Sequence, residues 1–165
     1  MKKCFRFFVF LFAIFINLNS YGNNSSANLA NNRTALRYIE LEKKFFNEKK
    51  YNQAISQVNL GFAYDDSISD LWYLYAIASK NLDSPKGNIL SYVKTSLEKN
   101  NWVEYNKDNA RLLYADLLCD TGSYNEVFDL LDASPMIYSS DAEIIRVKAF
   151  YRQNTSESIQ KAREK

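Results

Sequence analysis

The strongest constraint on the fold is an amphipathic stretch of sequence that occurs twice. "YNQAISQVNLG" begins at Tyr51, and "YNEVFDLLDAS" begins seventy-three residues later, at Tyr124. Each stretch opens with Tyr-Asn, carries Ala54 or Val127 at its fourth position, and continues with apolar residues at the spacing of a helix. The recurrence predicts one helical unit that the chain uses more than once.

Apolar stripes of the same kind, separated by short polar turns, run from Ala35 to the end of the chain. Four glycines and two prolines in 165 residues suit helices joined by short turns better than many-stranded β structure. Helices are expected over 35–46, 54–62, 71–82, 88–100, 110–120, 124–133 and 141–153, with a short last one from Ser156. Asp70 is a candidate cap for the third helix, and Pro135 is expected to stop the sixth. The sequence therefore predicts an all-α fold of consecutive helix pairs.

The spacing between equivalent positions supports this interpretation. Glu42 precedes Ala54 by twelve residues, and Ala115 precedes Val127 by twelve. The separation is 34 residues from Glu42 to Ala76 and 39 residues from Ala76 to Ala115. The five additional residues fall in turns, one of them in "LDSPKG" and four in "NNWVEYNKD". Insertions that are confined to turns are typical of repeat arrays.

Three segments fit the first half of the tetratricopeptide-repeat pattern, a helix–turn–helix unit of about 34 residues. They are Tyr38-x2-Leu41-Glu42-x2-Phe45, Trp72-x2-Tyr75-Ala76 and Arg111-x2-Tyr114-Ala115-x2-Leu118. The second half of the pattern is matched by Ala54-x3-Val58 and Val127-x3-Leu131. The chain departs from the pattern because Glu42 stands where two helices cross and a small residue is needed, and because no unit has the terminal proline in register. Over residues 35–165 the sequence thus resembles the tetratricopeptide repeat (TPR) family.

The resemblance implies an α-solenoid of antiparallel helix pairs, with about three and a half TPR-like repeats in a right-handed superhelix. The units would span 35–68, 69–107, 108–139 and an incomplete 140–165. In that family, the first helix of each pair lines a concave face that binds a protein or peptide. The matching positions here are Ile39, Lys43, Tyr73, Ile77, Lys80, Leu112, Asp116 and Asp120. For each of them, ordinary surface or packing between repeats is the alternative.

Residues 1–22 have the three parts of a secretory signal peptide. A basic start is followed by an unbroken apolar run at residues 7–16, and Ser20 and Gly22 occupy the small-residue positions of a cleavage site. Ten helical residues span about 15 Å, or about half the hydrocarbon core of a bilayer. This length favours a cleaved signal over an uncleaved membrane anchor.

The Asn- and Ser-rich residues 23–34 show no apolar periodicity and are expected to form a flexible linker. Because a signal peptide precedes them, the protein is expected to be exported to a periplasm, a cell envelope or the medium. Contact with a membrane is expected only through an uncleaved signal segment.

Composition argues against several classes of function. The chain has no histidine, which is the commonest general base near neutral pH and the commonest metal ligand. Cys4 lies in the leader and Cys119 is alone, so neither a disulfide nor a cysteine-rich zinc site is expected in the exported chain. Without the three basic residues of the leader, 18 basic residues face 19 acidic ones, and this balance gives no reason to expect nucleic acid as a partner. No cofactor or metal is expected.

Two carboxylate pairs and the lone cysteine are the remaining candidates for catalysis. Asp65 and Asp66 lie in a predicted turn, and Asp129 and Asp132 lie on a helix flank, where solvated surface is the ordinary interpretation. Cys119 has no histidine to activate it and is expected to be a small packing residue. The sequence therefore predicts a non-catalytic module or scaffold that binds a protein or peptide.

Two alternatives remain open. The chain is either the N-terminal part of a larger TPR protein with its activity elsewhere, or an α/α domain that binds a carbohydrate or another small molecule. The last segment, "SIQKAREK", has room for about two helical turns. Since terminal repeats need a polar cap for solubility, self-association through an uncapped C-terminal end is a further expectation.

Overall fold

The computed structural model describes residues 27–133 and 139–164, and every regular element in these ranges is a helix. The first helix occupies residues 27–47. Those that follow are α2 (Tyr51–Phe62), α3 (Ser69–Asn81), α4 (Lys86–Lys99), α5 (Lys107–Thr121), α6 (Tyr124–Asp132), α7 (Ser140–Gln153) and α8 (Ser156–Arg163). The prediction of an all-α fold is confirmed.

Each of the repeated Tyr-Asn stretches opens a helix. α2 begins at Tyr51, three residues before its expected start at Ala54, and α6 begins at Tyr124, as predicted. Before α6, Gly122 ends α5 with a φ of 85°, a left-handed conformation that glycine adopts without strain. At the start of α8, Thr155 and Ser158 form a reciprocal capping box, which satisfies two backbone N–H groups that the helix itself leaves free.

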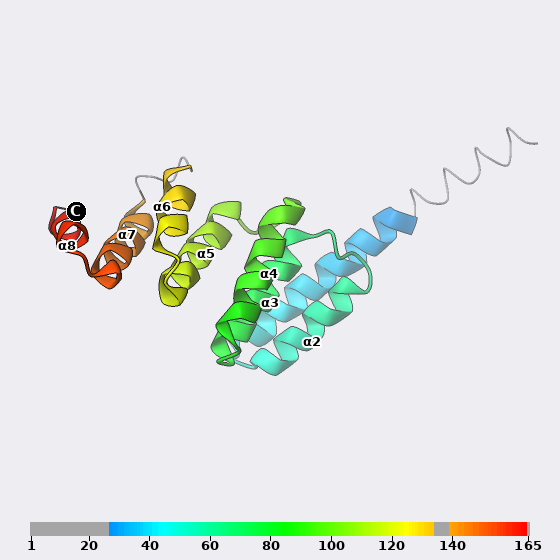
Figure 1. Ribbon diagram of the computed structural model, residues 1–165. Helices are drawn as coiled ribbons and strands as arrows, with labels where there is room; N and C mark the ends of the chain where they lie inside the picture. Colours follow the sequence, from blue (N-terminus) through cyan, green and yellow to red (C-terminus); the bar gives the residue numbers. More distant parts are fainter. Residues whose placement is uncertain (1–26, 134–138, 165) are drawn as a thin grey trace, which may run out of the picture.

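Each helix packs against its neighbours in the sequence. Contacts join α2 to α3, α3 to α4, α4 to α5, α5 to α6, α6 to α7 and α7 to α8, and α5 also touches α7. Figure 1 shows the helices following one another in chain order, from the blue first helix at one end to the red α8 at the other. The molecule is therefore elongated along the order of its chain.

Three clusters of buried side chains follow one another in the same direction. The first joins the first helix, α2 and α3 and includes Ile39 and Leu74. The second surrounds Val93 of α4, and the third surrounds Leu131 of α6 and reaches α7. A fully buried Leu, Ile or Val side chain contributes about 1.5–3 kcal/mol to folding. Stability is thus distributed along the array and does not reside in a single core.

The positions that define the predicted spacing are all buried. Glu42, Ala76 and Ala115, which the spacing places at equivalent points of three first helices, are each 0% exposed. Ala54 and Val127, at equivalent points of two second helices, are also 0% exposed. Two of the three first-helix positions therefore hold alanine, whereas the other buries a carboxyl group.

The predicted linker is wrong over most of its length, because residues 27–34 are helical. Alanine has the highest helix propensity, and a helix already formed over residues 35–47 extends without a new nucleation cost. The added turns also gain a tertiary contact, since Asn32 Nδ2 donates to Asp65 Oδ2 at 3.0 Å. The absence of apolar periodicity therefore did not indicate a flexible segment here.

The predicted cap of α3 is also wrong. Ile68 is the N-cap residue of α3, and Asp70 lies in the first turn with its side chain fully buried. The predicted signal peptide, residues 23–26 of the predicted linker and Pro135 all lie outside the described residues. Over residues 27–133 and 139–164, no helix combines the length and the apolar character that crossing a bilayer requires.

Candidate functional site

The connection from α4 to α5, residues 100–106, lies within the segment 100–108 in which a four-residue insertion is predicted, and we call it the strap. Three consecutive backbone N–H groups of the strap donate to the Asp70 carboxylate: those of Val103 at 2.9 Å, Glu104 at 2.8 Å and Tyr105 at 2.7 Å. Asn101 N donates to Ser69 Oγ at 2.8 Å, and Ser69 N donates to Asn101 O at 2.9 Å. Hydrogen bonds to a buried carboxylate are charge-assisted and strong, so the strap is fixed to the start of α3.

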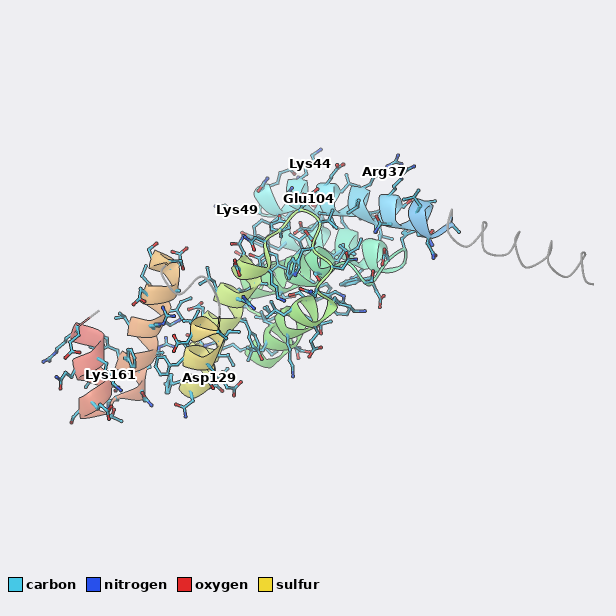
Figure 2. The ribbon with its side chains drawn as sticks, turned by 90° about the horizontal axis from the view of Figure 1, so that it is seen from above. Arg37, Lys44, Lys49, Glu104, Asp129 and Lys161 are labelled. Carbon is cyan, nitrogen blue, oxygen red and sulfur yellow. The ribbon has the colours of Figure 1, made fainter. Side chains whose placement is uncertain are left out.

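Side chains of the strap contact two of the predicted binding residues. The rings of Trp102 and Tyr105 lie 6.3 Å and 5.3 Å from the ring of Tyr73. Glu104 accepts a hydrogen bond from Lys43 of the first helix, and the Lys43 ammonium lies 5.6 Å from the Tyr105 ring centroid. Figure 2 shows the strap, labelled at Glu104, beside the first helix. Lys43 and Tyr73 are therefore engaged by the chain itself.

A buried carboxyl group lies close to the strap. The Glu42 side chain is 0% exposed, and neither of its carboxyl oxygens has a hydrogen-bond partner. Burial raises the pKa of Glu42 from 4.5 to about 7, although the charge of Lys43 opposes this change. Burial and the nearby Glu42 raise the pKa of Tyr105 to about 12. Burial thus favours the protonated form of Glu42.

A second group of side chains joins α3, α4, α5 and α7, and we call it the charged face. Its members are Lys80, Lys86, Asp116, Asp120, Lys148 and Arg152. Asp116 of α5 lies 3.2 Å from the Lys80 ammonium and accepts a hydrogen bond from Lys148. The four cations outnumber the two carboxylates, so the charged face carries an excess of positive charge.

Asp120 lies one turn beyond Asp116 and pairs with three cations: Lys86 at 3.4 Å, Lys148 at 2.9 Å and Arg152. Burial by itself raises the pKa of both carboxyl groups, but hydrogen bonds from the surrounding cations outweigh it. The pKa of Asp116 is lowered by Lys148 and Lys80, and that of Asp120 falls to about 2. Both groups are therefore ionised near neutral pH and are poor general bases.

The eight residues predicted to contact a partner fall into three groups. The charged face brings together Lys80, Asp116 and Asp120, and the strap engages Lys43 and Tyr73. Ile77 and Leu112 are half-buried against the first and third core clusters. Ile39 is 0% exposed in the first cluster, so its prediction as a contact residue is wrong. It lies one turn before Glu42, on the side of the first helix that packs against α2 and α3.

Sequence reasoning missed half of the charged face and the position of the strap. Lys148 and Arg152 are four residues apart on the predicted seventh helix, so this cationic stripe was a signal available in the sequence. Trp102 and Tyr105 stood in a predicted linker, and no local pattern there indicates a fold-back onto Tyr73. That contact depends on the tertiary structure.

Two other candidates for chemistry, Asp65 and Cys119, have structural roles. Asp65 accepts hydrogen bonds from Ser67 N at 3.0 Å and Ser67 Oγ at 2.6 Å and so closes a turn. Cys119 is 1% exposed, as expected for a packing residue, and burial raises the pKa of its thiol. Within the described ranges, no three Cys, Asp or Glu side chains converge as a metal site requires.

A cleft of about 390 Å³ lies between α6, α7 and α8. Its lining residues are Asn125, Phe128, Asp132, Arg146, Phe150, Gln153 and Lys161. The rings of Phe128 and Phe150 stack with centroids 4.5 Å apart, and Arg146 pairs with Asp132 at 3.0 Å. The cleft thus combines an aromatic pair with polar and charged groups.

Comparison with known proteins does not assign a family. No family model matches the chain. Over 127 residues it is 29% identical to an uncharacterized protein of Treponema pallidum (strain Nichols). The match covers 74% of this chain and 16% of that protein, so the chain spans only a small part of the relative's length.

Proposed function

We propose that the chain is a non-catalytic, TPR-like helical-repeat module that binds a protein or peptide along one face. Three features support the family resemblance: Tyr51 and Tyr124 open equivalent helices, Ala76 and Ala115 are buried at equivalent positions, and consecutive helices pack in chain order. In this proposal the array is an α-solenoid with a right-handed superhelix. Stacked helix pairs of this kind bury a continuous core and leave an extended concave surface for a partner.

The charged face is the observation that carries the proposal. It brings the predicted residues Lys80, Asp116 and Asp120 together with cations of α4 and α7, across four helices. Exposed ion pairs contribute only about 0–1 kcal/mol each, so a partner can exchange them for its own charged groups at little cost. The excess of positive charge favours a partner segment that carries carboxylates.

We propose a non-catalytic function because both carboxylates of the charged face are already paired with cations. Asp116 and Asp120 accept from two or three cations each, and their lowered pKa values make them weak proton acceptors. Groups in this state can provide charge complementarity to a partner, but they have little capacity for proton transfer.

We further propose that the module is exported to a periplasm, a cell envelope or the medium, where it acts as a scaffold. This part rests on the basic, apolar and small-residue segments of the first 22 residues. A variant of the proposal is that the module belongs to a longer protein, since the Treponema relative extends far beyond the matched region.

The cleft between α6, α7 and α8 supports a second candidate function, the binding of a carbohydrate or another small molecule. Small-molecule sites are often concave and lined by aromatic groups with a few polar ones, as Phe128, Phe150 and Gln153 are arranged here. A Phe150→Ala variant separates the two candidates, because it alters the cleft and leaves the side chains of the charged face in place.

The test is affinity capture from the exporting compartment, with the full chain as bait and with Lys80→Glu and Tyr73→Ala variants. Lys94→Glu is the matched control, because Lys94 is an exposed lysine of α4 that pairs only weakly with Glu98, at 3.9 Å. We expect Lys80→Glu to lose partners that the control retains. If neither Lys80→Glu nor Tyr73→Ala changes the captured set, the proposed binding face is wrong. Loss with Phe150→Ala alone would favour the small-molecule candidate.

A further inference from the structure

Glu42 and Asp70 are both fully buried carboxylates, but their surroundings differ. Asp70 accepts three backbone hydrogen bonds from the strap. Glu42 accepts none, and both of its oxygens are enclosed. On the strap, Trp102 Nε1 is likewise enclosed without a partner. An unpaired buried polar group disfavours the closed structure, and an ionised one disfavours it far more.

The groups near Glu42 come from several elements. Its neighbour on the first helix is Lys43, whose ammonium pairs with Glu104 of the strap. The pKa of Tyr105, on the strap, is raised by the charge of Glu42 and also by those of Tyr73 and Asp70 of α3. The buried face of α2 consists of Ala54, Val58 and Gly61, none of which ionises. Lys43 is therefore the nearest compensating charge, and Glu104 already neutralises it.

We propose that Glu42 is a proton-controlled latch of the strap: the protonated side chain stabilises the closed strap, and ionisation of the side chain increases the population of an open strap. Opening releases Lys43 from Glu104, uncovers Tyr73 and adds both to the binding face. The latch is a regulation of the proposed function and rests on it for its biological meaning. Its physical basis, the opening of the strap, can be measured without any partner.

Among the elements around Glu42, the strap is the one that moves in this proposal, because its backbone has no helical hydrogen bonds. Residues 100–106 form an irregular connection, whereas the first helix and α3 are regular helices anchored in the first core cluster. Strap opening brings water to Glu42 and frees Lys43 from Glu104, and both changes stabilise the ionised carboxylate. Separating α2 or α3 from the first helix would in addition expose apolar residues of that core.

The direction of the pH effect follows from the pKa of Glu42 in the two states. In the closed state it is about 7, and in the open, hydrated state it returns towards 4.5. The closed state therefore holds its proton more tightly, so closure is most stable below pH 4.5 and weakens as the pH rises through 7. Between pH 6 and pH 8 this linkage increases the population of the open strap by about tenfold.

Amide hydrogen exchange of the full chain measures this opening directly, through the N–H groups of Val103, Glu104 and Tyr105. After correction for the intrinsic pH dependence of exchange, we expect their protection to fall by about tenfold between pH 6 and pH 8. The protection of amides within α5 should change much less. Equal changes in the strap and in α5 would indicate global unfolding and would overturn the latch.

Three variants test the role of the carboxyl group. Glu42→Gln stays neutral at every pH and should remove the pH dependence, and Glu42→Leu should do the same if the amide perturbs folding. Glu40→Gln is the matched control, because Glu40 is exposed on the same helix, and it should behave like the unmodified chain. The latch is overturned if both Glu42 variants keep the wild-type pH dependence, or if Glu40→Gln abolishes it.

The regulatory consequence is tested with a fluorescent tetraglutamate peptide, a probe whose carboxylates can pair with the Lys43 ammonium once Glu104 has left it. We expect its affinity for the full chain to be higher at pH 8 than at pH 6, by up to about tenfold, and this increase to be absent in Glu42→Gln. If the strap opens but the affinity for the peptide does not change, the opening does not add Lys43 to the binding face. If partner capture depends on Lys80 while the strap stays protected at pH 8, the proposed function stands and the latch fails.

Discussion

The two halves of the predicted binding face differ in how their polar groups are satisfied. Near the first helix and α3, the strap pairs with Lys43 and packs on Tyr73, and the carboxyl groups of Glu42 and Asp70 are fully buried. Near α5 and α7, the carboxylates of the charged face remain 20–29% exposed and pair with side chains. We call these the covered half and the open half. In the covered half, changing a single buried carboxyl group should alter the free energy of unfolding strongly. In the open half, each exposed ion pair should contribute little to it.

One part of the predicted binding surface therefore stabilises the fold, and the other part is free to contact a partner. In the covered half, the extra residues between α4 and α5 form the strap, which occupies the predicted binding residues in the way that a bound peptide would. In the open half the face stays available. Substitutions in the covered half should therefore act first on stability, and those in the open half first on binding.

The largest effect is expected for Asp70→Ala. Three strap N–H groups lose their acceptor, and loss of charge-assisted hydrogen bonds from a buried carboxylate should lower the free energy of unfolding by about 4 kcal/mol. Chemical denaturation followed by circular dichroism measures this. Asp108→Ala is the control, since Asp108 lies in the first turn of α5 and pairs with Arg111 at 3.4 Å near the surface. Equal losses in both variants would contradict the special role of the covered half.

The next largest effect is the pH dependence that Glu42 imposes on stability. Its pKa in the folded chain is about 7, above the usual 4.5, so its contribution to stability is complete below pH 4.5 and is lost as the pH rises through 7. The free energy of unfolding should fall by about 2 kcal/mol between pH 5 and pH 8. Thermal and denaturant unfolding across this range should show the fall in the unmodified chain.

Glu42→Ala sharpens the same comparison, because it places at this position the residue found at Ala76 and Ala115. It should remove most of the pH dependence and leave a chain that is more stable at pH 8 than the unmodified one. A chain that becomes less stable at pH 8 would indicate that the volume lost at Glu42 outweighs the relief of a buried charge.

The sequence predicted the helices better than the contacts between them. Apolar spacing predicted the all-α fold, the start of α6 and the start of α2 to within three residues, because these features depend on local periodicity. Residues 27–34 were misassigned because the rest of the first helix, and not the local pattern, extends the helix through them. Ile39 was misassigned because the family resemblance does not show how the first helix is rotated about its axis. In the structure this rotation places Ile39 in the core.

The site was predictable in its open half and not in its covered half. Lys80, Asp116 and Asp120 lie at positions that the repeat spacing specifies, and the structure joins them in one ionic cluster. The environment of Tyr73 depends on a fold-back of the strap, a long-range contact with no local pattern. A partial indication of the Glu42 site was present in the sequence, because Glu42 stands at a position where the repeat pattern has a small residue.

In the open half, Asp120→Asn should have a smaller effect with the opposite pH direction. The pKa of Asp120 is about 2, below its usual 3.8, so its stabilising contribution is present above pH 3.8 and is lost as the pH falls through 2. After allowance for solvent screening, the loss at pH 7 should be about 1 kcal/mol. The exposed Asp129→Asn, on α6 (Figure 2), is the control and should change stability by less than about 0.5 kcal/mol. A loss in Asp120→Asn that persists at pH 2 would show that its ion pairs are not the cause.

The smallest effect on stability is expected for Lys80→Ala, and this variant tests the comparison most directly. The Lys80 side chain is 45% exposed and pairs with Asp116 at 3.2 Å, and Asp116 retains Lys148 when Lys80 is removed. The free energy of unfolding should therefore change by less than about 0.5 kcal/mol, while partner capture falls. Denaturation and capture should be measured on one preparation, with Lys94→Ala as the control. A destabilisation as large as that of Asp70→Ala would mean that the charged face is a structural clasp, and that both halves serve the fold and neither serves a partner.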